Sequence, residues 1–444
     1  MSNRIVLFKL LIPLSILLTL IFPLSSVALA VDVNAPAAPE TPLDTDDLDT
    51  DFGGFGNGGI VSLPEMDAEA FALQSDEKIV VVGENAGQIV VARFLQDGSP
   101  DSDFGEAGIR TIQVTGDHPC EYRGKKEFSR CGITIQPDGK IVVVGDIETA
   151  GKENFLVMRL TENGGLDPTF GFVQTDFKGN RDHANDVAIQ LVDGEVKIVV
   201  TGTASDDDLF DDDNYFATAR YNLDGSLDTS FKGTGKVTTR VGEAGVFGES
   251  AWNYARDLVI QPDNKIVVAG QATETVVNSN LEFGVVRYLE SGELDDTFSG
   301  NGIRVFGFGG TDDARGISLL PDGKLAVVGQ AGSSSKLAAA LLNADGSSDD
   351  DFNGNGKFDR DHSSSGDESL MAVASQPDGK FVAVGYAGDK LVLMRVKPDG
   401  NLDTSFVNGG ILDSHDGFGL DLIIQPDGKF LVLLGDSMMR LNPN

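Results

Sequence analysis

The sequence predicts an all-β fold, because two phrases of strand and turn residues recur along almost the whole chain. The more regular phrase is QPDGKIVVVG at residues 136–145, and the second has the form LDTSFKGTGKV at residues 227–237. Pro-Asp-Gly favours a tight turn, and the β-branched run after it is typical of a strand buried on both faces. The copies are 49 to 68 residues apart, the spacing of a repeated structural unit. Seven lysines mark the turn of the first phrase: Lys78, Lys140, Lys197, Lys265, Lys324, Lys380 and Lys429.

Each repeated unit contains four short predicted strands in a fixed order. The first is an apolar run before the turn, such as GITIQ at residues 132–136, and the second is the β-branched run after it. The third is a run such as YFATARY at residues 215–221, and the fourth follows the LDTSF phrase and a glycine-rich turn. Four short antiparallel strands in each of seven units predict a β-propeller.

The order of the strands also predicts how the ring closes. A fourth-type strand, GGIVSL at residues 58–63, comes before the first complete unit, and the chain ends after a third-type strand, MMRLNPN at residues 438–444. We expect the N-terminal strand to become the outer strand of the last blade, which leaves no open sheet edge. The prediction is a seven-bladed β-propeller of four-stranded antiparallel blades over residues 48–444, closed by the N-terminal strand in the last blade.

The two phrases resemble the delta-60 repeat family of bacterial exported proteins. The consensus of that family is close to QPDGKIVVAG, then VARYNxDG, then LDxSFGxGG, and both phrases occur in register from about residue 48 to residue 444. The resemblance implies a propeller fold. It implies no particular activity, because the family has none that is general.

Residues 1–30 have the order of a secretory signal: two basic residues, an apolar run to Leu24, and small residues that end at Ala30. We expect cleavage after Ala30. The alternative is a retained N-terminal anchor, because the apolar run is nearly long enough to span a bilayer. Residues 31–47 are rich in Pro and Ala and then acidic, which predicts a disordered linker. The mature chain is expected to be an exported monomer without a membrane span, in the periplasm, outside the cell or on its surface.

Charge and cysteine content narrow the classes of partner. The net charge of −35 opposes binding to nucleic acid or anionic lipid and favours association with cations. Cys120 and Cys131 are the only cysteines, and in an exported protein they predict a local disulfide. The alternative is a metal site formed by the two thiols, for which His118 is the nearest further ligand.

An arginine in the third strand and an aspartate in the LDxxF phrase recur together. A guanidinium fork suits a carboxylate, so we expect each pair to brace one blade. If the ring closes as predicted, Arg440 lies beside Asp49. The repeated phenylalanine of the same phrase is expected to pack between blades. Six units carry the arginine, and the fifth has leucine: Arg93, Arg159, Arg220, Arg287, Leu341, Arg395 and Arg440.

Irregular residues are confined to two kinds of connection. One precedes the first strand, at residues 115–131 and 241–254, and the other joins the second and third strands, at residues 203–214 and 271–281. Both emerge on one face of an antiparallel blade, and a rigid scaffold normally carries its binding residues on the variable face. The alternative is that these are solvated loops. The aromatic candidates for a binding face are Trp252, Tyr254, Tyr122 and Tyr215.

Acidic side chains supply the candidate metal ligands. Asp186, Asp257 and Asp421 stand four residues before the turn glutamine, so three carboxylates near the mouth of one channel are available to Ca²⁺. The alternative is solvent-exposed acid, and the same holds for the acidic run from Asp206 to Asp213. Residues 351–362 match the opening of a Ca²⁺ loop, but they end on His362 where Glu is required, so we interpret them as scaffold. No cofactor other than calcium is predicted.

No catalytic residue is predicted, because the chain has no GxSxG, HExxH or phosphate-binding glycine motif. We expect a binding or interaction module whose partner is an unknown protein or glycan. The alternative is a carbohydrate-active hydrolase or lyase that uses carboxylates on the variable face, with calcium. A purely structural envelope component is a third interpretation.

Overall fold

The computed structural model consists of two units, residues 1–37 and 38–444. The predicted signal peptide, the predicted linker except residue 47, His118 and Tyr122 lie outside the residues that the structure describes. Those residues are 47–53, 58–114, 119–120, 130–179, 181–206, 213–242, 251–273, 280–363, 367–413 and 415–443.

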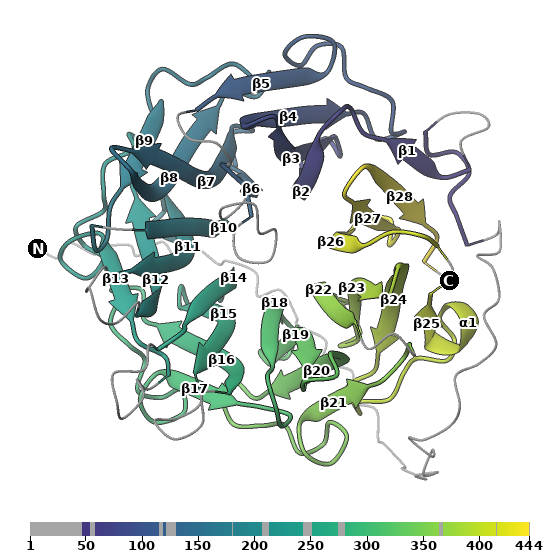
Figure 1. Cartoon of the computed structure of the whole chain (residues 1–444). Coiled ribbons are helices and arrows are strands. Elements are labelled where there is room, and N and C mark those ends of the chain that lie inside the picture. The colour runs from purple at the N-terminus through teal and green to yellow at the C-terminus, as the bar shows by residue number, and fades with distance from the viewer. Residues whose placement is uncertain are drawn as a thin grey trace, which may run out of the picture. The chain divides into compact units, whose positions relative to one another are not determined.

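Four sheets of the second unit contain four consecutive antiparallel strands each (Figure 1). One contains β2 (Asp67–Leu73), β3 (Ile79–Asn85), β4 (Gln88–Phe94) and β5 (Ile109–Gln113). Another contains β14 (Tyr254–Ile260), β15 (Ile266–Thr273), β16 (Leu281–Tyr288) and β17 (Ile303–Phe306). The next contains β18 (Asp313–Leu319), β19 (Leu325–Ala331), β20 (Lys336–Leu342) and β21 (Lys357–Arg360). The last contains β22 (Glu368–Ser375), β23 (Phe381–Ala387), β24 (Lys390–Val396) and β25 (Ile411–Leu412).

A larger sheet of eight strands contains two further groups of four. The first group is β6 (Gly132–Ile135), β7 (Ile141–Thr149), β8 (Lys152–Leu160) and β9 (Phe172–Thr175). The second group is β10 (Arg181–Val192), β11 (Glu195–Ser205), β12 (Asn214–Tyr221) and β13 (Lys236–Thr239). A single parallel pairing of Arg181 with Glu153 joins the groups, and strand pairing within each group is antiparallel.

One sheet combines the two ends of the described chain. It contains β26 (Gly419–Ile424), β27 (Phe430–Leu434), β28 (Ser437–Leu441) and, as its outer strand, β1 (Ile60–Ser62). β1 is antiparallel to β28, with Ile60 opposite Met439. Among the described residues the only helix is the single turn α1 (Val407–Gly410), which the sequence analysis did not anticipate.

The two repeated phrases form the turns and buried strands that their residues predict. The backbone N–H of Gln136 donates to the carbonyl of Lys140 across the PDGK turn, at 2.8 Å, and Gly139 adopts a φ of 83° there. Ile141 and the three valines that follow it are completely buried. Apolar clusters form the core between neighbouring sheets, and the repeated phenylalanines are buried in them. Phe104, for example, belongs to one cluster with Val80 of β3 and Ile141 of β7.

The first strands of the sheets lie next to one another around a common centre (Figure 1). The contacts run in chain order, from β2 to β6, β10, β14, β18, β22 and β26, and β26 also contacts β2. Six of these strands contain a β-bulge, at which the register with the second strand skips one residue. The skipped residues are Glu69, Asn185, Arg256, Arg315, Met371 and Leu420.

Candidate functional site

The described aromatic residues that were predicted for a binding face lie on β12 and on or next to β14. Trp252 precedes β14, and its side chain is 49% exposed. Tyr254 is the first residue of β14, and its hydroxyl accepts a hydrogen bond from Asn214 at 3.1 Å. The hydroxyl of Tyr215 donates to Asp206 at 2.9 Å, and Lys178 lies 3.7 Å from the centre of its ring. These contacts tie Tyr215 to the scaffold and leave Trp252 as the exposed aromatic residue of the group.

The three aspartates predicted to face a channel each bind the backbone of the next sheet. Asp186 accepts a hydrogen bond from the N–H of Leu258 at 3.0 Å, and Asp257 accepts one from Ile317 at 2.7 Å. Asp421 accepts one from Phe71 at 3.2 Å, which links the last sheet to the first complete one. At this position, therefore, a carboxylate helps to hold neighbouring first strands together.

The same aspartates lie close enough together to change one another's titration. The side chains of Asp186 and Asp257 share a hydrogen bond, and burial together with the charge of Asp186 raises the pKa of Asp257 well above its ordinary value. Burial also raises the pKa of Asp186, and it raises the pKa of Asp421 to about 6. Because these pKa values are raised in the folded state, the groups stabilise the fold at low pH and lose that contribution as pH rises through the folded pKa.

The geometry gives little direct support for calcium at these aspartates. Within the described ranges, no group of three or more His, Cys, Asp or Glu side chains is arranged to hold a metal ion. Most of the acidic run 206–213 lies outside the described residues, and its two ends pair with Lys178 and Arg240. Calcium binding stays a prediction.

The predicted disulfide is present. Cys120 and Cys131 are both buried, with an S–S distance of 2.05 Å. Both cysteines belong to the apolar cluster that contains Val80 of β3 and Ile141 of β7.

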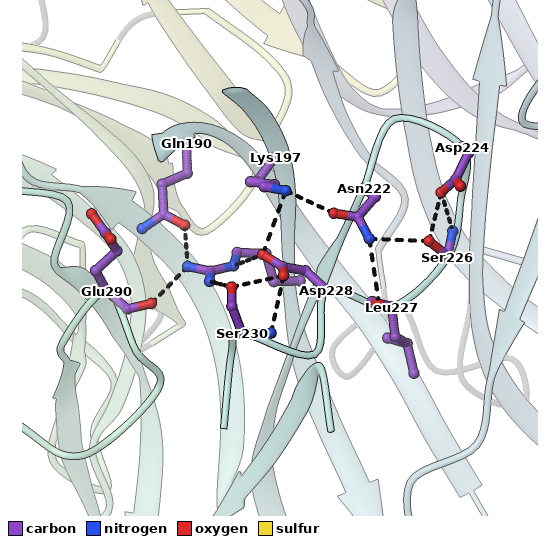
Figure 2. Close-up of polar contacts among 10 residues, drawn as sticks. Gln190, Lys197, Asn222, Asp224, Ser226, Leu227, Asp228, Ser230 and Glu290 are labelled. Carbon is purple, nitrogen blue, oxygen red and sulfur yellow. Dashed lines mark hydrogen bonds and ion pairs between the residues drawn. The ribbon is translucent and has the colours of Figure 1, made fainter. Parts of the chain in front are cut away.

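The repeated arginine and aspartate form buried ion pairs. Nε of Arg220 donates to Asp228 at 2.8 Å, and another guanidinium nitrogen donates to the side chain of Gln190 at 2.9 Å. The same guanidinium reaches the backbone carbonyl of Glu290 in the next sheet at 2.6 Å. Figure 2 shows the ring of partners, in which Lys197 approaches Asp228 from the other side. One arginine thus connects the turn of its own sheet, the first strand and the neighbouring sheet.

The pair at the two ends of the described chain has the same geometry. Nε of Arg440 lies 2.7 Å from Oδ2 of Asp49, and Nζ of Lys429 lies 2.9 Å from the same oxygen. Burial acts to raise the pKa of Asp49, but the hydrogen bonds and charges of Lys429 and Arg440 outweigh it and lower the pKa. A lowered folded-state pKa means that this pair stabilises the fold at neutral pH and that the contribution is lost on acidification.

A pocket of about 250 Å³ lies at the bulges of the first strands. Its charged lining includes Glu69, Arg130 and Arg315, with the exposed carboxylates of Asp67 and Asp367. Its apolar lining is Ala68, Met371, Tyr386, Phe418, Leu420 and Gly435. We call these residues the arginine pocket.

Two guanidinium groups meet at one sulfur atom in the arginine pocket. Arg130 lies 3.8 Å from Sδ of Met371, and Arg315 lies 3.6 Å from the same atom. Arg315 also pairs with Asp313 at 3.1 Å, and Asp313 in turn lies 3.5 Å from Arg256. Burial lowers the pKa of Arg130 and of Arg256, and the positive charge of Arg315 acts in the same direction on both. These guanidinium groups are therefore partly removed from water, although the protein as a whole is strongly acidic.

The opening of the arginine pocket is aromatic. The rings of Tyr386 and Phe418 meet edge to face with centroids 5.0 Å apart. Phe418 is 46% exposed, although its ring packs against Tyr386. Such an arrangement offers an apolar surface to a ligand next to the buried charges.

Sequence analysis missed the arginines of this pocket. Arg315 stands one residue before the aspartate position of the first strand, where other units have Glu69, Asn185, Arg256, Met371 or Leu420, whereas Arg130 lies in the irregular connection before β6. That unrepeated column was a usable signal, because its residues differ in charge from unit to unit. Residues of this column line the pocket because each is the extra residue of a β-bulge, and the repeated phrases do not predict a bulge.

Comparison with known proteins agrees with the propeller interpretation of the repeats. Six segments match a family described as "Domain of unknown function (DUF5122) beta-propeller". The chain thus carries β-propeller repeats. The segments are residues 74–104, 136–170, 197–231, 261–298, 320–352 and 376–406, which together make up less than half of the chain. No curated protein matches the chain.

Solved structures of low similarity were also found. The polysaccharide lyase Uly1 has 11% identity and a TM-score of 0.48, and the match covers 90% of this chain and 98% of that protein. A streptogramin B lyase has 11% identity and a TM-score of 0.47, with coverage of 87% and 96%. At these values, no property of either protein is transferred to this chain.

Among the described residues, no helix has both the length and the apolar character needed to cross a membrane.

Proposed function

We propose that residues 48–444 form a seven-bladed propeller of the delta-60 type, closed by β1 in the last blade. The eight-stranded sheet counts as two blades in this proposal, because only the pairing of Arg181 with Glu153 joins its halves. The unbroken series of contacts between first strands, including β26 with β2, supports a closed arrangement. So does the ion pair of Arg440 with Asp49.

The proposed function is that of an exported binding module, with the arginine pocket as its ligand site. The observation that carries this proposal is the convergence of Arg130 and Arg315 beside an aromatic surface, in a cavity of about 250 Å³. The repeated residues are occupied in holding sheets together, whereas the pocket is lined by residues that differ between units. The disulfide and the signal-like N-terminus support export.

The test is a thermal unfolding screen of residues 31–444 against glycans, small organic acids, organic amines and millimolar Ca²⁺. A ligand that binds only the folded state raises the midpoint. The matched variant is Leu420→Trp, which fills the arginine pocket from a bulged position. A ligand of the pocket should shift the wild type and lose its effect on the variant. A ligand that shifts both proteins equally binds elsewhere, and if every active ligand behaves so, the proposed site is wrong.

A second candidate is a carbohydrate-active hydrolase or lyase. It is favoured by the carboxyl pair of Asp186 and Asp257, because a carboxyl group with a raised pKa is suited to general acid catalysis. It is disfavoured by their shared hydrogen bond, since the two carboxyl groups of glycoside hydrolases are about 5 Å or more apart. Release of new reducing or unsaturated sugar ends, abolished in Asp257→Asn, would establish this activity.

A further inference from the structure

The arginine pocket contains more donor capacity than its own residues use. Each guanidinium carries five N–H donors, whereas a thioether sulfur is a weak acceptor. Arg130 and Arg315 both direct a terminal nitrogen to Sδ of Met371, at 3.8 and 3.6 Å. Within the described part of the chain, Arg130 forms no ion pair shorter than 4.0 Å. The two guanidinium groups therefore share a neutral acceptor, and of the two only Arg315 has a carboxylate within 4.0 Å among the described residues.

The nearby carboxylates do not fill this gap. Asp313 is 5% exposed and lies between Arg315 and Arg256, so one carboxylate serves two guanidinium groups. The charges of Glu69, Asp421 and Asp313 act favourably on Arg130 without an ion pair, and the charge of Arg315 acts against it. Asp67 and Asp367 are exposed to solvent at the rim. Arg130 and Arg315 are half-buried. A charge that is partly removed from water is costly unless it is paired, and a further anion would pair the two arginines at once.

The remaining wall of the pocket suits an apolar group. Met371 and Leu420 occupy bulged positions, and Tyr386 and Phe418 form the edge-to-face pair at the opening. A volume of about 250 Å³ accommodates one aromatic ring with a short chain. A ligand of this shape would cover the exposed ring of Phe418 while its charged end reaches the arginines.

We propose that the arginine pocket binds a small organic carboxylate with an aromatic or aliphatic body. The carboxylate lies between Arg130 and Arg315 and accepts hydrogen bonds from both, and the body packs on Met371, Leu420 and Phe418. The inference rests on the proposed binding function and specifies its ligand class. The opposite assignment, an amine held by Glu69 and the rim aspartates, is an outcome of the test.

The test uses three probes of one shape: 3-phenylpropionate, its neutral amide and 3-phenylpropylamine. Calorimetric titration of residues 31–444 should show the carboxylate binding about 10 to 100 times more tightly than the amide, because hydrogen bonds to charged groups are worth about 1.5–3 kcal/mol. Arg130→Gln should weaken binding of the carboxylate about tenfold, because one of its two charged donors is lost, and should leave the affinity for the amide unchanged. Arg110→Gln, an exposed arginine on β5 outside the pocket, is the matched control and should change neither affinity.

Two further variants keep the inference testable if Arg130→Gln does not fold. Arg315→Gln removes the other guanidinium, and Arg130→Lys keeps the charge but loses the planar fork, so it should give an intermediate loss. The thermal midpoint of each variant without ligand reports folding separately from binding.

Three results would overturn the inference. In the first, the amide or the amine binds as tightly as the carboxylate. In the second, none of the three probes binds at millimolar concentration. In the third, the carboxylate binds to Arg130→Gln and to Arg315→Gln as tightly as to the wild type. In the first case a loss of binding in Leu420→Trp would still support the pocket as the ligand site. The proposed function itself would be wrong if every active ligand raised the thermal midpoint of Leu420→Trp as much as that of the wild type.

Discussion

At the residue scale, the fifth unit differs from the others at two repeated positions that contact each other. Six units have both an arginine in the third strand and a glutamine before the turn, as in Arg220 with Gln190 or Arg93 with Gln74. The fifth unit has Leu341 and Leu320 at these two positions, both buried in one apolar cluster. Asp349 of that unit is then paired with Lys324 at 2.8 Å. Arginine and glutamine have thus been replaced together, while the aspartate has kept a cationic partner.

We expect Arg220→Leu to destabilise the protein by about 2–4 kcal/mol, because the side-chain oxygen of Gln190 loses its donor and Asp228 keeps Lys197, 3.8 Å away, as its cationic partner. Adding Gln190→Leu should recover about 1 kcal/mol of that loss, because the buried amide oxygen is no longer left without a donor. Urea unfolding of the single and double variants measures both quantities.

The companion variant Asp228→Ala should cost about 3–5 kcal/mol, more than Arg220→Leu, since it leaves a buried guanidinium without its carboxylate. The coupling inferred from the fifth unit would be wrong if the loss of stability in the double variant Arg220→Leu with Gln190→Leu equalled the sum of the losses in the two single variants.

At the scale of a single strand, the bulge of the first strand determines which residue fits opposite it. The bulge near Leu370 brings the carbonyl of Ser369 to Gly385 of β23, where a Cβ atom would lie 1.9 Å from that oxygen. The matching position of the last sheet is Leu434, which lies opposite Gly419, and Gly435 follows one residue later, after the end of β27. A Cβ atom built on Gly435 would have its nearest neighbour 3.9 Å away. Glycine is thus sterically required at residue 385, whereas the last sheet has leucine at the matching position and no steric need for glycine at residue 435.

Gly385→Ala should therefore destabilise the protein by about 3 kcal/mol or more, because the backbone of β22 has to move away. Gly435→Ala should change the free energy of unfolding by less than about 0.5 kcal/mol. Neither glycine has a left-handed φ, so the comparison isolates the steric contact. Equal effects of the two substitutions in urea unfolding would contradict the role assigned to the bulge.

The difference between these two glycines also shows where sequence analysis reached its limit. The turn PDGK, the buried run after it and the pairing of Arg440 with Asp49 follow from repeated residues, because each repeat must satisfy the same local geometry. The bulge is a register change of one residue in the first strand, and it leaves no composition signal. The direction of Arg315 and Met371 into a common pocket depends on it, so those residues emerged only with the structure.

The first-strand aspartates are an intermediate case. The sequence predicts that Asp186, Asp257 and Asp421 lie near one another, and their mutual effect on pKa agrees with that. Their use as acceptors for backbone N–H groups of the next sheet was not anticipated, because it depends on how successive first strands are offset.

At the scale of the whole molecule, the proposed closure places unusual importance on a short segment. β1 has three residues, yet its sheet position covers the outer edge of β28, and the chain before it supplies Asp49 and the buried Phe52. Phe52 and Val61 belong to the apolar cluster that also contains Leu431 and Val81, so the segment contacts both the last sheet and the next one.

A chain that begins at residue 63 should consequently lose far more stability than one that begins at residue 47. The longer deletion leaves Arg440 buried without its carboxylate, removes two core side chains and exposes the edge of β28, and we expect a loss of at least about 5 kcal/mol. Thermal unfolding of the two chains measures the difference. A synthetic peptide of residues 47–63 should raise the midpoint of the shorter chain in proportion to its concentration, because it binds only the folded state as an added strand. Identical midpoints for the two chains, with no effect of the peptide, would mean that the sheets are held together without the terminal strand and that the proposed closure is wrong.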